Sequence, residues 1–298
     1  AGAGSGKTTV LINRIANILR YGRGSEGIEI PGFVKEEDVT FLESLPPEPT
    51  EDQCQRADCL CALEPAKPWN VIAITFTNKA AGELKDRLET MLGESAGDVW
   101  AMTFHAACCR ILRRNIDRMG YTSSFTIYDT SDSERLMKEV LKDMSLDDKT
   151  FPHKLVLSII SRQKDQLISP EQMLEESRSA SDLRLPQIAK AYKTYQQRLK
   201  DNNALDFDDI LYVTVKLLQQ EADVREYYQH KFQYVLVDEY QDTNHVQYLL
   251  TALLAGKWGN ICVVGDDDQS IYRFRGATIE NILSFEEQYP GARVIRLE

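Results

Sequence analysis

The first eight residues, AGAGSGKT, constrain the fold more than any other part of the chain. They match the phosphate-binding pattern G-x-x-x-x-G-K-S/T at Gly6, Lys7 and Thr8. Ala1 replaces the first glycine of the pattern, which is a mild departure. The apolar helical pattern TTVLINRIANIL follows directly, as the motif requires. The sequence therefore predicts a helix whose positive end points at a bound phosphate.

The residues of this loop have expected roles at a bound nucleotide. Lys7 would reach the β- and γ-phosphates, and Thr8 would ligate Mg²⁺. The glycines let successive backbone N–H groups turn inward around a phosphate, which a Cβ atom would oppose. A Gly-rich turn before an ordinary helix is the alternative interpretation. The predicted nucleotide-binding residues are Gly4, Ser5, Gly6, Lys7, Thr8 and Thr9.

Length and composition indicate a globular chain: 298 residues, 43% hydrophobic and 27% charged, enough for about two domains. A phosphate loop normally follows a buried strand, and the sequence has no residues before Ala1 to form one. We therefore expect the chain to be a piece of a longer protein. It has no signal peptide and no apolar run of about 18 residues, which predicts neither secretion nor membrane insertion.

The net charge of −11 is unevenly distributed along the chain. Residues 36–64 contain nine acidic residues and one basic residue, Arg56, and carry −8 of this charge. The total charge therefore does not exclude basic surface elsewhere, or a nucleic-acid partner.

The six cysteines do not resemble a disulfide framework, because Cys108 and Cys109 are adjacent in a helical pattern and Cys262 lies in an apolar strand pattern. Reduced thiols and a cytoplasmic location are expected. Cys54, Cys59 and Cys61 could supply three zinc ligands. A nearby fourth Cys or His is missing, which favours free thiols over a zinc site.

Short apolar runs rich in β-branched residues alternate with helical patterns, which is typical of a parallel sheet covered by helices on both faces. The expected strands cover residues 70–76, 98–104, 233–239, 260–266 and 292–298.

The pattern changes to long amphipathic helices, without a convincing strand, between residues 105 and 204. Residues 22–69 are acidic and rich in Gly and Pro. We therefore predict an α/β domain formed by residues 1–104 and 205–298. A helical domain, 105–204, would interrupt it, and a loop-rich insertion, 22–69, would lie outside both cores.

Asp238 and Glu239 follow the apolar run YVLV. In an open parallel sheet, ligands bind at the carboxyl ends of the strands. Asp238 can hold Mg²⁺ beside Thr8, and Glu239 can orient and deprotonate the water that attacks the γ-phosphate. A solvated strand end or a helix cap is the alternative. The upstream phosphate loop favours the catalytic interpretation.

The segment VVGDDDQSIYRFRGA also leaves an apolar run. Gln269 is an uncharged amide suited to contact a γ-phosphate. Tyr272 and Phe274 alternate with arginines, so they can present stacking faces to bases while the arginines contact phosphates. Packing of these aromatic side chains beneath the loop is the alternative.

Six segments together resemble superfamily 1 DNA helicases of the UvrD/PcrA type. They are AGAGSGKT, AITFTNKAA, TFHA, LDFDDIL, VLVDEYQDTN and VVGDDDQSIYRFRGA. The resemblance spans nearly the whole chain outside residues 22–69, and alanine is common at the first loop position in this family. It implies a RecA-like ATPase domain that uses ATP and Mg²⁺, with Lys7, Asp238, Glu239 and Gln269 as catalytic residues.

The resemblance also implies a path for single-stranded DNA. Arg275 would contact the nucleotide and couple its site to DNA. The implied DNA contacts are Phe76, Thr77, Asn78, Thr103, His105, Tyr272 and Phe274. Beside this path, four arginines share one predicted helix face, and some of them are expected to contact phosphates: Arg110, Arg113, Arg114 and Arg118.

A motor of this family would move 3′ to 5′ on single-stranded DNA and unwind a duplex with a 3′ tail, in DNA repair or replication. A second RecA-like domain, expected from a longer parent chain, would supply the transition-state arginine. Two alternatives stay open: the motor portion of a helicase–nuclease, and a nucleotide-switched DNA-binding module that remodels protein–DNA complexes without unwinding.

Overall fold

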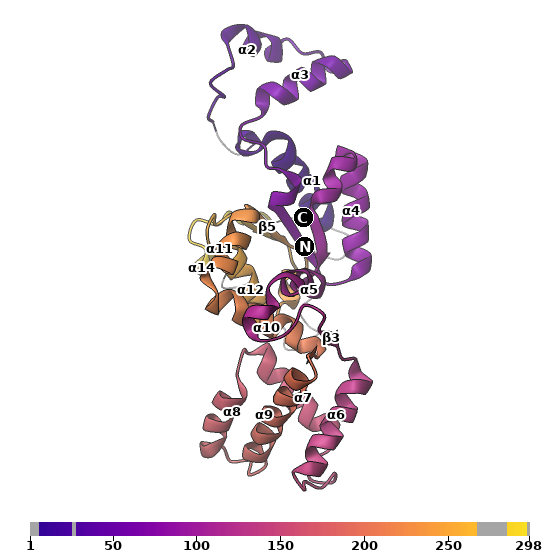
Figure 1. Cartoon of the computed structure of the whole chain (residues 1–298). Helices are drawn as coiled ribbons and strands as arrows, with labels where there is room; N and C mark the ends of the chain where they lie inside the picture. Colours follow the sequence, from indigo (N-terminus) through magenta and orange to yellow (C-terminus); the bar gives the residue numbers. More distant parts are fainter. Residues whose placement is uncertain (1–5, 26–27, 267–284, 297–298) are drawn as a thin grey trace.

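A computed structural model of the chain describes residues 6–25, 28–266 and 285–296. Its centre is a four-stranded sheet of strand order β2-β1-β5-β6, in which all neighbouring strands are parallel (Figure 1). This confirms the predicted α/β fold with a parallel sheet. The strands are β1 (Val71–Thr75), β2 (Trp100–Thr103), β5 (Tyr234–Val237) and β6 (Ile261–Val263).

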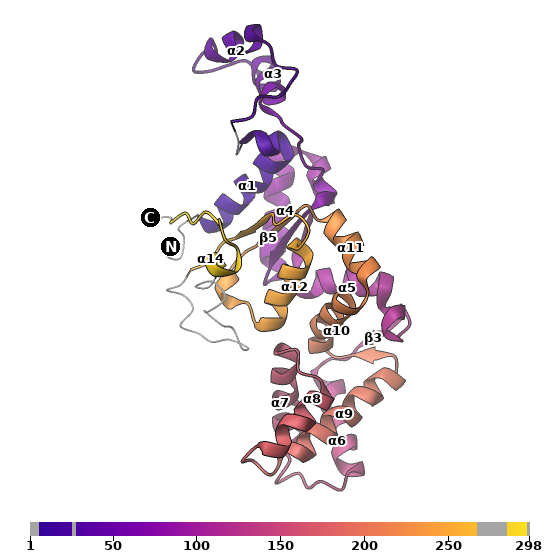
Figure 2. The ribbon, with the colours of Figure 1, turned by 90° about the vertical axis from the view of Figure 1, so that its left-hand side faces the viewer.

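Helices cover both faces of the sheet, because the inner strands are apolar on both sides. Val71 and Ala73 pack against α1 (Lys7–Tyr21) and α4 (Asn78–Leu92). Ile72 and Ile74 pack in a second cluster on the opposite face. Figure 2 shows α1 and α12 on either side of β5. The helices of the second cluster are α5 (Phe104–Asn115), α10 (Phe207–Gln220), α11 (Ala222–Lys231) and α12 (His245–Ala255).

Four of the five expected strands form, and the expected strand at 292–298 does not form over its described part, residues 292–296. This segment follows the short helix α14 (Phe285–Gln288). Val294 and Ile295 are 58% and 68% exposed. An apolar run becomes a strand only where a neighbouring strand satisfies its backbone hydrogen bonds, and the pattern of one segment does not reveal that neighbour.

A bundle of helices lies below the sheet in Figure 1 and packs around a hydrophobic cluster of its own. Two short parallel strands that the pattern did not predict run side by side next to it, β3 (Thr126–Ile127) and β4 (Ala204–Leu205). Helix α5 packs with the sheet and not with the bundle. The domain boundaries at 104/105 and 204/205 stay predictions. The bundle helices are α6 (Thr130–Asp143), α7 (His153–Asp165), α8 (Pro170–Glu176) and α9 (Leu185–Asp201).

A buried charge cluster joins the bundle to the α/β lobe. The Lys164 ammonium of α7 lies 2.7 Å from Asp206 Oδ2 and 2.8 Å from Asp209 Oδ1, and its side chain is fully buried. Asp206 also caps α10 and accepts a hydrogen bond from the Tyr195 hydroxyl. One ammonium between two carboxylates leaves excess negative charge. Burial, followed by the charge of Asp206, accordingly raises the pKa of Asp209 to about 7.

Asp209→Asn is expected to flatten the pH dependence of the free energy of unfolding between pH 5 and 8. The folded-state pKa of Asp209 exceeds its unfolded value, so its contribution to stability falls as the pH rises toward the folded-state pKa and is constant above it. The loss is at most about 3 kcal/mol in this window, since one unit of pKa corresponds to about 1.4 kcal/mol. Urea unfolding at several pH values measures it. If the free energy of unfolding changed equally with pH in the parent and the variant, this assignment would be wrong.

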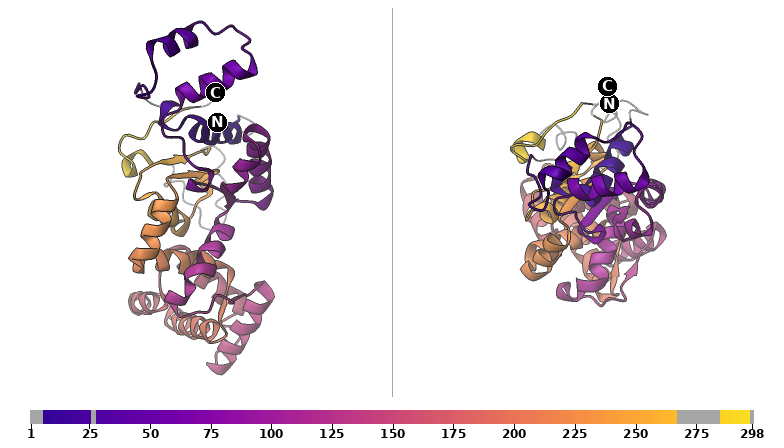
Figure 3. Two further views of the ribbon diagram at one scale, coloured as in Figure 1. Left: turned by 45° about the horizontal axis from the view of Figure 1, so that its top comes forward. Right: turned by 90° about the horizontal axis from the view of Figure 1, so that it is seen from above.

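Residues 22–69 contain two helices that the composition did not predict, α2 (Glu36–Glu43) and α3 (Glu51–Cys61). They project from the end of the molecule opposite the bundle (Figures 1 and 3). Acidic residues fill the first turn of each helix, where they complement the helix dipole, and Thr50 forms a capping box with Gln53. These local effects stabilise helices although α2 buries none of its residues.

The cysteines at positions 54, 59 and 61 are exposed on α3 and form no disulfide. In the part of the chain that the structure describes, no three His, Cys, Asp or Glu side chains are grouped so that they could hold a metal ion. The preference for free thiols stays a prediction.

The insertion leaves and rejoins the fold through a closed stem. Leu63 N donates to Tyr21 O at 2.9 Å, and Arg23 N donates to Leu63 O at 2.9 Å. The backbone of Gly22 has φ 55°, and a Cβ atom there would lie 2.3 Å from the carbonyl oxygen of Glu64. Only glycine therefore fits this crossing.

Candidate functional site

The candidate site lies at the carboxyl ends of the parallel strands, where α1 begins. Gly6 caps α1 in a left-handed conformation with φ 81°, which glycine adopts without strain. Lys7 and Thr8 occupy the first turn of the helix, so its positive end faces the same region. The predicted phosphate loop thus leads into a helix as expected over its described part.

The first key contact joins the start of α1 to the end of β5. Thr8 Oγ1 donates to Asp238 Oδ2 at 3.3 Å across 230 residues of sequence. Asp238 is 3% exposed, and burial, followed by the charge of Glu239, raises its pKa. A hydroxyl and a carboxylate are oxygen donors of the kind that Mg²⁺ prefers, so this pair fits the predicted metal.

A second contact joins α1 to the end of β6. Lys7 Nζ lies 2.9 Å from Asp266 Oδ2, and the lysine is 9% exposed. A buried ammonium at a helix N-terminus can bind a phosphate once it exchanges this carboxylate for the ligand. Asp266 was not singled out from the sequence.

Glu239 lies at the same edge in a left-handed conformation, with φ 49°, which is unusual for a residue with a side chain. Its backbone N–H donates to Asp238 Oδ1 at 3.0 Å. Gln241 Nε2 donates to Glu239 Oε2 at 2.7 Å. The site therefore combines a cation, a hydroxyl and two adjacent carboxylates, which is a chemistry suited to a nucleotide phosphate and a divalent metal.

Five of the residues predicted to contact DNA, Phe76, Thr77, Asn78, Thr103 and His105, lie where β1 and β2 end. Thr77 Oγ1 accepts from Ala80 N at 3.1 Å and caps α4, and Thr103 caps α5 in the same way. Asn78 is exposed in the first turn of α4. The threonines thus have structural roles as caps. Their proposed DNA contacts stay predictions.

Two aromatic contacts extend this edge. The Phe76 ring packs against Phe104 in an edge-to-face arrangement at 5.4 Å. The His105 ring stacks on Phe207, with centroids 3.8 Å apart, and Phe207 is 46% exposed. Phe207 was not singled out from the sequence, although it lies within the quoted segment LDFDDIL. The available signal was an aromatic residue between acidic residues at the start of an apolar helical pattern.

Three of the four arginines of the predicted basic face contact other parts of the fold. Arg113 donates to the carbonyl oxygens of Ser123 and Phe125, and Arg118 pairs with Glu221 and Asp223. The Arg110 guanidinium lies 4.1 Å from the centre of the Trp100 ring. These contacts hold the fold together, so phosphate binding by this face stays a prediction.

Several predicted residues lie outside the described ranges, so the structure does not place them. They are Gly4, Ser5, Gln269, Tyr272, Phe274 and Arg275.

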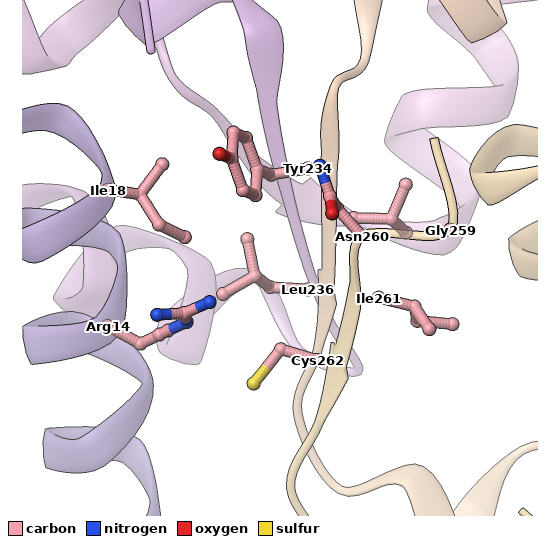
Figure 4. A pocket seen from close by; sticks show the side chains of 9 residues that line it. Arg14, Ile18, Tyr234, Leu236, Gly259, Asn260, Ile261 and Cys262 are labelled. Atoms are coloured by element: carbon pink, nitrogen blue, oxygen red, sulfur yellow. The ribbon is translucent and has the colours of Figure 1, made fainter. Parts of the chain in front are cut away.

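A cavity of about 150 Å³ lies between α1 and strands β5 and β6 (Figure 4). Arg14, Ile18, Leu236 and Cys262 are among the residues that line it. None of the candidate site residues that the structure describes lines this cavity, so it is distinct from the edge where Thr8 meets Asp238.

Comparisons with known proteins agree with the geometry. Residues 55–290 match the family described as the UvrD/REP helicase N-terminal domain. The ATP-dependent DNA helicases PcrA of Staphylococcus epidermidis and Bacillus subtilis are each 45% identical over all 298 residues. The PcrA of Staphylococcus aureus is 44% identical over the same length. This chain spans 35%, 34% and 35% of these relatives, respectively. No helix in the described ranges is long and apolar enough to cross a membrane.

Proposed function

Since the chain belongs to the UvrD/REP helicase family, we propose that it is the ATP-binding part of a DNA helicase that hydrolyses ATP to move along single-stranded DNA. The observation that carries this proposal is the meeting of Thr8 with Asp238 at the carboxyl edge of the sheet. The start of α1 meets the end of β5 there, at the sheet edge where Phe76 follows β1 and His105 follows β2.

Each residue of the site has a proposed role in hydrolysis. Gly6, Lys7 and Thr9, with Gly4 and Ser5, would bind the phosphates. Thr8 and Asp238 would hold Mg²⁺, which when bound neutralises charge on the phosphates. Glu239 would accept a proton from the attacking water. Gln269 and Arg275 are proposed to contact the nucleotide from the segment after β6.

The DNA strand is proposed to run along the same edge. Phe76, His105 and Phe207 would contact bases, while Thr77, Asn78 and Thr103 would contact the backbone. Tyr272 and Phe274 are proposed to continue this surface. The carboxyl ends of adjacent parallel strands share one edge, so hydrolysis and DNA binding would occupy neighbouring positions on it.

We further propose a 3′ to 5′ polarity, a duplex with a 3′ single-stranded tail as substrate, and a role in DNA repair or replication. A second RecA-like domain of the parent protein would complete the motor. The proposed DNA substrate and the predicted reduced thiols favour the cytoplasm.

Turnover of ATP by the full-length protein tests this proposal, with and without single-stranded DNA. We expect DNA to stimulate hydrolysis, and we expect a duplex with a 3′ tail to be unwound faster than one with a 5′ tail. An equal rate of ATP hydrolysis with and without single-stranded DNA would contradict the motor assignment. Equal unwinding of both substrates would contradict the polarity alone.

Phe207→Ala is expected to weaken single-stranded DNA binding by about 1 to 3 kcal/mol, the typical loss when a base loses an aromatic stacking partner. His105→Ala should have a similar effect. Because the two rings stack on each other, the double variant should lose less than the sum of the single variants. Fluorescence anisotropy with an oligonucleotide measures the binding.

Tyr227→Ala provides the matched control for this experiment, because Tyr227 is 52% exposed on α11 and its ring lies against Tyr228. It should bind DNA like the parent. Equal losses in Tyr227→Ala and Phe207→Ala would show that the effect is not specific to the strand-end edge.

A further inference from the structure

We propose that Gln241 is a positioning residue, which fixes the carboxylate of Glu239 by linking it to the segment that follows β6. This inference rests on the proposed function, in which Glu239 activates the attacking water. Gln241 lies in a short 3₁₀ helix, Tyr240–Asp242, and its side chain is 2% exposed. Neither a nucleotide nor DNA is needed to explain why this polar side chain is buried.

The amide of Gln241 uses both of its ends. Its Nε2 donates to Glu239 Oε2 at 2.7 Å, and its Oε1 accepts from Asp266 N at 2.9 Å. These partners also fix which way the amide points, because a carboxylate only accepts hydrogen bonds and a backbone N–H only donates them. Rotating the amide by 180° would break both bonds. The side chain is therefore held in one orientation.

The side chain of Gln241 continues the hydrogen bonding between the segments that follow β5 and β6, at the point where their backbone–backbone hydrogen bonds end. Val264 N donates to Val237 O, and Tyr240 N donates to Val264 O, each at 2.9 Å. Asp266 N, two residues after Val264, donates to the side-chain oxygen of Gln241. The Gln241 side chain thus adds one hydrogen bond between the two segments beyond the ends of β5 and β6. It ties the Glu239 segment to the end of β6.

Glu239 needs such a partner because neither its backbone nor its side chain is held by regular structure. The left-handed backbone conformation costs about 1 to 2 kcal/mol for a residue with a Cβ atom. A glutamate side chain in addition has several rotatable bonds, and a proton acceptor must stay within hydrogen-bond reach of the water. The bond from Gln241 restrains one carboxylate oxygen.

A further contact connects Gln241 indirectly to Lys7, the residue proposed to bind phosphate. Asp266, whose N–H is bound by Gln241, pairs through its Oδ2 with Lys7 Nζ at 2.9 Å. The order of contacts is therefore Glu239, Gln241, Asp266 and Lys7. Gln241 accordingly connects the residue proposed to activate water to Asp266, the carboxylate that Lys7 would exchange for a phosphate.

The test compares ATP hydrolysis by the full-length protein with Gln241→Leu, which has a similar volume but no amide. We expect kcat to fall about 10- to 100-fold, the scale on which misplacement of a reacting group acts. Nucleotide affinity should stay within about twofold, because the described hydrogen bonds of the Gln241 side chain go to Glu239 and to the backbone of Asp266. Gln241→Asn keeps the amide but is one methylene too short to reach both partners. It should also lower kcat.

A double variant separates positioning from general stability. Once Glu239→Gln has removed the proposed base, adding Gln241→Leu should lower single-turnover hydrolysis no further, since both changes act on the same step. Gln247→Leu is the matched control: Gln247 is also buried, and its side chain accepts a hydrogen bond from Asn244 N in the capping box of α12. It should lower the melting temperature while it leaves kcat near that of the parent.

Three results would overturn the inference: an unchanged kcat in Gln241→Leu, a full additional loss in the Glu239→Gln background, or a loss of kcat in Gln247→Leu of the same size. If Glu239→Gln alone kept normal turnover, the proposed role of Glu239 would fail and this inference would fail with it. If Glu239→Gln lowered kcat as expected and Gln241→Leu left kcat unchanged, the proposed function would stand and only the positioning role would be rejected.

Discussion

Lys7→Ala is expected to lower the ATP turnover of the full-length protein by at least about 10²- to 10³-fold, the loss typical when one preorganised partner of a developing negative charge is removed. Lys7 is buried beside Asp266 at the N-terminus of α1. Alanine there leaves no cation to contact the phosphates, so nucleotide binding should weaken as well.

Glu239→Gln should separate binding from chemistry at the same site. The substitution keeps the size of the side chain and removes the proton acceptor, so turnover should fall about 10²- to 10⁴-fold while ATP still binds. Binding of a fluorescent ATP analogue and steady-state hydrolysis measure the two effects. Near-normal turnover in Glu239→Gln would contradict its role as the base.

Lys138→Ala controls for the loss of a lysine in general, since Lys138 is exposed on α6 in the helical bundle. It should hydrolyse ATP like the parent. If Lys7→Ala kept its affinity for the analogue and lost only turnover, contact with the phosphates before the reaction would be excluded.

A protein made of residues 1–298 alone is expected to hydrolyse ATP about 10³- to 10⁵-fold more slowly than the full-length protein. Nucleotide hydrolases of this kind gain such a factor from an arginine that approaches the phosphates from a second domain or partner. The PcrA relatives have nearly three times the length of this chain, since the chain spans 35% of them. That length can supply the arginine.

The measurement is ATP turnover by purified residues 1–298 with saturating single-stranded DNA. The Lys7→Ala form of the same protein is the control for contaminating ATPase activity. Robust DNA-stimulated hydrolysis that disappears in this control would show that one domain suffices and that the two-domain mechanism is wrong.

The local signals in the sequence predicted much of the candidate site. A phosphate loop, an acidic pair after an apolar run and alternating strand patterns are each written in contiguous residues. The geometry that brings Thr8 to Asp238 then follows from the parallel topology, because strands of such a sheet end at one edge. The local motifs and the parallel topology of the sheet therefore predict the same contact.

The remaining contacts could not be predicted, because they join residues that are distant in sequence. Asp266 meets Gln241, and His105 meets Phe207, only after the strands and α10 have packed. Neither pair has a periodic pattern. By contrast, the helix α3 had a local signal, the T-x-x-Q capping box at residues 50–53. The overall acidity of the segment had suggested loops instead.

The closed stem of the insertion has a consequence for how this chain could have evolved. Since Tyr21 and Leu63 are hydrogen-bonded to each other, the two ends of the segment lie side by side. An ancestor with a short turn at this position would need no change in α1 or β1 to accommodate the extra residues. The segment can thus be gained or lost in a single genetic event, as a cassette. Its sequence can then diverge under selection separate from that on the α/β lobe.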